Sequence, residues 1–250
     1  VITAMVYKRR LKHILVKTEK EARDVLTKLK AGDSFEMAPD DNPLTEGEFK
    51  WSANMGLAFG AKGIQYFSLV QPTNPIFHQS PMGLLDSTGA ENAAGYYDWA
   101  MDVNEELTAI DHILVNATHE GIMTTGTHAT TQAANNVKDI ELYKSKIFGV
   151  GLDSQGNAKV EVFNDSGNYA GATVTCATDS TYGTLTGCFK TADGKHALFI
   201  ANYNPEQDNT VAVNVGSGVA ATIIHEGNTT EATGSAYITP GAGEAALVVF

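Results

Sequence analysis

The second half of the chain alternates short apolar segments with turn-forming residues, and this pattern restricts the folds open to it. From about Gly121 onward, segments rich in Val, Ile, Ala and Thr recur roughly every ten residues, with Gly, Asn and Asp between them. Antiparallel β-sandwiches have this spacing, because each strand crosses one sheet before a turn reverses the chain. We therefore predict a β-sandwich over residues 121–250. Its predicted strands include Ala158–Phe163, Gly171–Cys176, Ala197–Asn202, Thr210–Val215, Ala220–His225 and Ala245–Phe250.

The preceding region has a different period. Thr45-Glu46-Gly47-Glu48 forms a capping box, which predicts a helix that starts there and ends near Gly60 or Gly63. The apolar run Ile64–Val70 predicts a buried strand, and a helical pattern runs from about Ala93 to Val115. This succession of helix, strand and helix is α/β in character. The chain as a whole is thus predicted to be mixed α/β plus all-β.

Charge is distributed unevenly along the chain. Residues 1–30 hold nine Lys and Arg against three Asp and Glu, whereas residues 31–250 hold eight against 26. Such a step marks a change of module, and Pro39 and Pro43 lie in a polar linker that follows it. We predict three domains: a segment with its linker over residues 1–43, an α/β unit over 44–120 and the β-sandwich over 121–250.

Several classes of partner are excluded by composition. A net charge of −12 repels phosphate backbones, so we expect no nucleic-acid partner. The longest apolar runs are a few residues, too short for a membrane span.

The seven histidines show no metal-ligand spacing, and we expect no metal and no cofactor. Cys176 and Cys188 lie on two strand-like segments. They could form a disulfide or remain free thiols, and the sequence leaves both alternatives open. We expect any signal peptide to have been removed already or to lie outside this sequence, so secreted and cytoplasmic locations both stay open.

Most of the chain resembles one enzyme family. Residues 44–72, LTEGEFKWSANMGLAFGAKGIQYFSLVQP, are similar to the last helix-strand unit of the (β/α)8 barrel in β-galactosidase-like glycoside hydrolases. Residues 96–115 resemble the closing barrel helix, and the sequences at 187–215 and 239–250 resemble the β-sandwich that often follows it. The resemblance implies a partial barrel unit followed by a sandwich, in a carbohydrate-active protein.

The same resemblance indicates where a sugar would bind. Barrel enzymes place ligand contacts at the C-terminal ends of their strands, and Tyr66, Phe67 and Gln71 lie at or just beyond such an end. The family's catalytic acid and nucleophile belong to earlier barrel strands, and this chain has no matching positions before Thr45. The catalytic residues are therefore unknown, and we expect the chain to be incomplete as a catalyst.

The remaining carboxylates are assigned structural or solvent-facing roles. Glu46 and Glu48 fit the first turn of a helix, where acidic side chains cap free amides. Asp86 and Glu91 are interpreted as loop acids. The predicted solvent face of the long helix consists of Asp98, Asp102, Glu105, Glu106 and Asp111.

A second resemblance lies at the start of the chain. Residues 11–38, LKHILVKTEKEARDVLTKLKAGDSFEMA, resemble the opening strand and helix of parvulin-type peptidyl-prolyl isomerases, with His13 at the strand-histidine position. The later motifs of that family are absent. Three functions are thus considered: a carbohydrate-active protein, a non-catalytic carbohydrate-binding or assembly module, and a prolyl isomerase. The missing barrel strands predict a homo-oligomer or a complementing chain.

Overall fold

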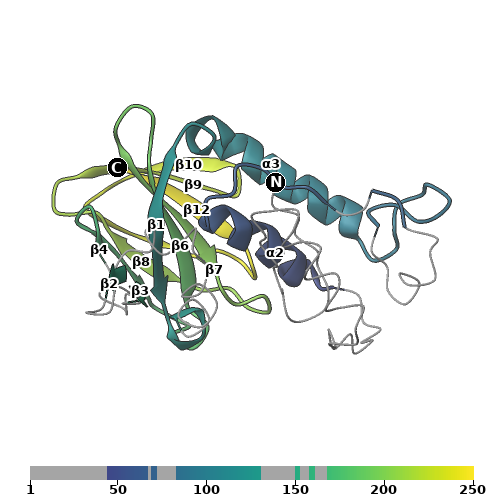
Figure 1. Ribbon diagram of the computed structural model, residues 1–250, viewed down its shortest axis with the longest axis horizontal. Coiled ribbons are helices and arrows are strands. Elements are labelled where there is room, and N and C mark those ends of the chain that lie inside the picture. The colour runs from purple at the N-terminus through teal and green to yellow at the C-terminus, as the bar shows by residue number, and fades with distance from the viewer. Residues whose placement is uncertain (1–43, 67–68, 72–82, 131–149, 153–157, 161–167) are drawn as a thin grey trace. The chain divides into compact units, whose positions relative to one another are not determined.

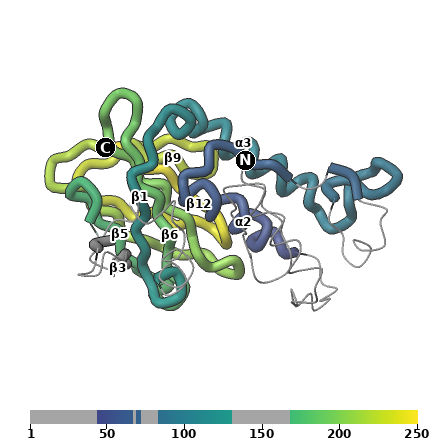
Figure 2. Tube along the Cα trace, in the orientation of Figure 1, coloured from purple at the N-terminus to yellow at the C-terminus, as the bar shows by residue number. Residues whose placement is uncertain are grey.

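The computed structural model describes residues 44–66, 69–71, 83–130, 150–152, 158–160 and 168–250 (Figures 1 and 2). The described residues fall into two compact units. The larger contains Thr45–Ile64 and Asp98–Phe250, and the smaller contains Leu44 and Gln65–Tyr97. The parvulin-like residues 11–38, with His13, and the predicted first domain 1–43 lie outside the described residues.

The larger unit is built on antiparallel sheets, which confirms the β part of the predicted mixed fold; the described residues form no (β/α) barrel unit (Figure 1). One sheet has six strands in the order β1 (Thr118–Thr125), β6 (Thr184–Lys190), β7 (His196–Asn202), β12 (Ala245–Val249), β9 (Ala220–His225), β10 (Asn228–Thr233). The second has the order β11 (Ser235–Ile238), β8 (Val211–Asn214), β5 (Ala172–Cys176), β4 (Asn168–Tyr169). A separate pair joins β2 (Val150–Leu152) and β3 (Ala158–Val160). Each of the six predicted segments contains a strand.

The six-stranded sheet is covered on both faces. The sequence of its strand β7 is almost continuously apolar because side chains on both faces of this strand are buried. Phe199 and Ala201 point into a core shared with the helices. Leu198 and Ile200, on the opposite face, point into a second core shared with β5 and β8 of the other sheet. Strands buried on both faces lose the usual alternation of apolar and polar residues. The two sheets therefore pack face to face as a sandwich.

Helix α2 (Glu46–Ala58) begins at the predicted capping box. The Thr45 hydroxyl accepts a hydrogen bond from the Glu48 amide at 3.2 Å, and the Glu48 carboxylate accepts one from the Thr45 amide at 3.0 Å. These bonds satisfy amides that a helix start leaves free. The helix ends just before Gly60, as predicted. The role assigned to Glu48 is confirmed.

Helix α3 (Tyr96–Leu114) occupies the predicted range 93–115. Its part within the larger unit packs Ile110 and Leu114 into the same core as Met55 and Leu57 of α2 and Phe199 of the sheet. Among the described residues, no helix is long and apolar enough to cross a membrane.

The two cysteines are free thiols. Cys188 lies on β6 of the six-stranded sheet and is fully buried, whereas Cys176 lies on β5 of the other sheet. Burial raises the pKa of the Cys188 thiol well above its usual value. Of the two alternatives for this pair, the structure has the free thiols.

The buried strand predicted over Ile64–Val70 is wrong, as its described residues in the smaller unit show. Leu69 and Val70 are 59% and 43% exposed, and the bridge from Val70 to Leu85 is an isolated parallel one. A buried parallel strand needs hydrogen-bonded neighbours and covered faces. The described part of this unit provides one bridging residue, so the apolar side chains remain at the surface.

Candidate functional site

The predicted sugar-contact residues lie in the smaller unit. Tyr66 is half-buried, and burial raises the pKa of its hydroxyl to about 12. Gln71 makes two hydrogen bonds to a nearby loop. Its side-chain oxygen accepts one from the backbone amide of Gly83 at 3.0 Å, and its backbone amide donates one to the Leu85 carbonyl at 2.8 Å. Phe67 lies outside the described residues. Gln71 thus has a structural role. Its predicted contact with a sugar stays a prediction.

Asp86 stabilises a turn. Its Oδ1 accepts hydrogen bonds from the amide and hydroxyl of Thr88 and from the Ala90 amide, at 2.7, 2.6 and 3.0 Å. The bonds from Thr88 are the main reason that the pKa of Asp86 lies below its usual value. Asp86 is therefore a turn-forming loop acid, as interpreted from the sequence.

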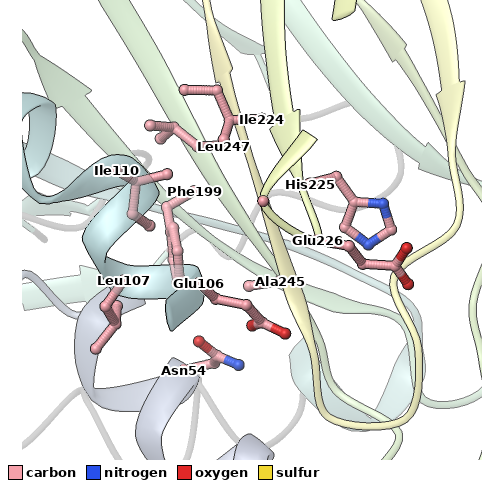
Figure 3. A pocket seen from close by; sticks show the side chains of 11 residues that line it. Asn54, Glu106, Leu107, Ile110, Phe199, Ile224, His225, Glu226, Ala245 and Leu247 are labelled. Carbon is pink, nitrogen blue, oxygen red and sulfur yellow. The ribbon is translucent and has the colours of Figure 1, made fainter. Parts of the chain in front are cut away.

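A small pocket in the larger unit gathers polar side chains between the helices and the end of the six-stranded sheet (Figure 3). Its cavity volume is about 20 Å³, which is room for one water-sized group. Leu107, Phe199 and Leu247 form its apolar wall. Its polar lining comes from Asn54 on α2, Glu106 on α3, and His225 and Glu226 at the end of β9.

The prediction that Glu106 lies on the solvent face of α3 is wrong. The other four acids of that face are exposed, but Glu106 is half-buried against the sheet and lines the pocket. Burial, and then the negative charge of Glu244, raises the pKa of the Glu106 carboxyl from 4.5 to about 7. Glu106 can therefore hold a proton near neutral pH, which an exposed glutamate does not do.

Glu244 lies beside the pocket in a fixed orientation. Lys50 of α2 donates to its Oε1 at 2.8 Å, and the Gly241 amide donates to its Oε2 at 3.1 Å. Lys50 also pairs with Glu46 at 2.8 Å. Burial alone would lower the pKa of Lys50, but the hydrogen bonds to Glu244 and Glu46 outweigh it and raise that pKa. Lys50 stays charged and offsets part of the local negative charge.

His225, Glu226 and Glu244 form a group that could hold a metal ion. Each offers one ligand atom, and these atoms all lie within 4.8 Å of one another. The Nε2 atom of His225 is buried and has no hydrogen-bond partner among the described residues. Histidine spacing did not predict this group, because its members come from two segments that meet only through the pairing of β9 with β12.

No family model, curated protein or solved structure matches this chain. The chemistry of the pocket is therefore interpreted from its own residues. A half-buried carboxyl, an unpartnered imidazole nitrogen and two further carboxylates can exchange protons or hold a cation. The cavity is too small for a sugar, since pockets for small molecules usually measure roughly 300 Å³ or more.

Glu106→Gln is expected to raise the free energy of unfolding by about 1 kcal/mol at pH 8 and to change it little at pH 4. The unfolded chain releases this proton near pH 4.5, whereas the folded protein keeps it to about pH 7, so the wild type loses stability as the pH rises through this range. Partial solvent exposure reduces the effect below the full value of the shift. Gln does not titrate and removes the loss.

Urea unfolding at pH 4, 6 and 8 in EDTA-containing buffer measures this effect. Glu105→Gln on the exposed side of the same helix is the control and should change stability by less than about 0.5 kcal/mol at each pH. Equal pH profiles for the wild type and Glu106→Gln would show that Glu106 titrates as an ordinary surface acid.

Proposed function

We propose that this chain is a carbohydrate-active module related to β-galactosidase-like glycoside hydrolases and incomplete as a catalyst. The order of its elements supports this: helix α2, the segment 64–70, helix α3 and then an antiparallel sandwich. The resemblance implies the same order for a partial (β/α) barrel unit and its following domain. The proposed sugar contacts are Tyr66, Phe67 and Gln71.

One observation carries the proposal more than any other. Leu69 and Val70 lie on the segment that resembles the last barrel strand, and both are exposed. Exposed apolar side chains on a segment that forms an isolated bridge and no regular strand are what a barrel strand presents when its neighbouring strands are absent. The same exposure favours the second candidate, an assembly module that pairs this segment with another chain or a second copy.

The proposal that catalysis is incomplete rests on the carboxylates. Glycoside hydrolysis uses two carboxyl groups about 5 Å apart in retaining enzymes, both facing the sugar. Glu48 caps a helix, Asp86 stabilises a turn and Glu46 pairs with Lys50. Glu106 faces a cavity of about 20 Å³, which no sugar ring enters.

The isomerase alternative rests on residues 11–38, outside the described residues, and stays a prediction.

A panel of aryl glycosides and a sugar titration test this function together. We expect turnover no faster than in buffer, and weak binding of galactosides in ligand-observed NMR. Tyr66→Ala should weaken that binding by about three- to tenfold, the effect of losing one aromatic contact. Tyr237→Ala is the matched control, because Tyr237 is a tyrosine 76% exposed on β11.

Three outcomes would contradict the proposal. Turnover that Glu46→Gln, Asp86→Asn or Glu91→Gln abolishes would show that the chain is a complete enzyme. Absence of galactoside binding, or equal binding in the wild type and Tyr66→Ala, would remove the carbohydrate role from this segment.

A further inference from the structure

We propose that His225, Glu226 and Glu244 bind a divalent transition-metal cation of the Zn²⁺ type beside the pocket of Glu106. The three residues belong to the larger unit, and the inference does not depend on sugar binding. His225 is the last residue of β9, Glu226 follows it in the turn to β10, and Glu244 directly precedes β12. Since β9 pairs with β12, their neighbouring ends bring the three side chains together.

The distances suit a single ion. One imidazole nitrogen and one carboxylate oxygen from each glutamate lie within 4.8 Å of one another. Ligands bound to zinc at about 2.1 Å lie roughly 3.4 Å apart, so the group must contract by an ångström or so to coordinate it. Glu226 is exposed at the tip of a two-residue turn, where its side chain is free to make this movement.

The imidazole of His225 gives a second indication of a ligand. Its Nε2 is buried from solvent and has no hydrogen-bond partner in the part of the chain that the structure describes. A buried polar atom left without a partner destabilises a fold, and most such atoms are satisfied. Figure 3 shows the imidazole of His225 and the carboxylate of Glu226 at the same end of strand β9. A cation held between an imidazole nitrogen and the two nearby carboxylate oxygens is a partner that fits this residue.

The local charge also favours a cation. Glu106, Glu226 and Glu244 interact electrostatically here, and Lys50 is the positive group that acts on Glu106. Lys50 pairs with Glu46 as well as Glu244, so the carboxylates outnumber the cation among these residues. The hydrogen bonds from Lys50 and Gly241 orient Glu244, as outer partners orient the ligands of metal sites.

The donor set selects the type of metal. Imidazole nitrogen suits zinc and its neighbours in the first transition row, whereas magnesium and calcium take oxygen ligands alone. One nitrogen and two carboxylate oxygens leave a fourth position for water, and the adjoining cavity has room for one water-sized group. A site built in this way would tie the β9–β10 turn to the start of β12.

Calorimetric titration of the full EDTA-treated chain with Zn²⁺ alone tests the proposal. We expect one site with micromolar affinity, and no heat of binding with Mg²⁺ at the same concentrations. His225→Ala should weaken Zn²⁺ binding by about 100-fold or more, because it removes a direct ligand. The control is His112→Ala on α3, whose imidazole is 69% exposed, and it should bind as the wild type does.

Thermal unfolding gives a second readout. Zn²⁺ at 100 times its Kd should raise the Tm of the wild type and of His112→Ala by about 5 to 10 °C. Glu226→Gln, at an exposed turn position that folding tolerates, should lose most of this rise and decides the question if His225→Ala does not fold. Equal Zn²⁺ affinity in the wild type and Glu226→Gln, or binding of Mg²⁺ in preference to Zn²⁺, would overturn the proposal.

Discussion

Phe199→Ala is expected to lower the free energy of unfolding by about 4 kcal/mol, the largest effect of a single core substitution that we predict here. Phe199 is 2% exposed on β7, a central strand, and its ring packs between the sheet and the helices with Ile110 and Leu247. Removing the ring leaves a cavity that the surrounding layers cannot close, since strands and helices are anchored on every side.

Urea unfolding followed by circular dichroism measures this effect. Tyr237→Ala on β11, where the side chain is 76% exposed, removes an aromatic ring of similar size and should change stability by less than about 0.5 kcal/mol. If both substitutions cost the same, the helices do not cover this face of the sheet in solution.

Gly183→Ala is expected to lower the free energy of unfolding by about 2 to 5 kcal/mol, for two separate reasons. Gly183 has a φ of +75°, which costs an alanine roughly 1 to 2 kcal/mol. A Cβ there would also lie 1.7 Å from the Thr125 carbonyl oxygen, a backbone atom that cannot turn away. Relieving that overlap requires β1 and the start of β6 to separate, which costs a further 1 to 3 kcal/mol or so.

Gly194→Ala separates the two contributions. Gly194 has a φ of +88°, but a Cβ there would meet nothing within 4 Å. We expect its cost to be about 1 kcal/mol, from the backbone conformation alone. Both variants are compared by urea unfolding. A difference of less than about 1 kcal/mol between them would contradict the close approach of Gly183 to Thr125.

Elements that depend on neighbouring residues in the chain are predicted well from the sequence. The start of α2 follows from Thr45 and Glu48, three positions apart, because their side chains satisfy each other's amides without help from the rest of the fold. Strand β9 has the predicted bounds, Ala220–His225, since apolar and β-branched residues between turn formers define it locally.

Burial is harder to predict, because it depends on which surfaces meet. The run Ile64–Val70 has the composition of a buried strand, yet Leu69 and Val70 are exposed. Glu106 was assigned to the solvent face of α3 by its charge. Its position, three residues after Val103 and four before Ile110, places it beside the apolar stripe, and this spacing is the signal that could have found it.

The sequence by itself determined helices α2 and α3 and the antiparallel strands of the second half, because these follow from periodicity and turn residues within short windows. Only the tertiary structure decided that Glu106, His225 and Glu244 share one site. These residues are far apart in the chain, and the docking of α3 on the sheet and the pairing of β9 with β12 bring them together. Such long-range contacts depend on how whole elements pack, which no local pattern specifies.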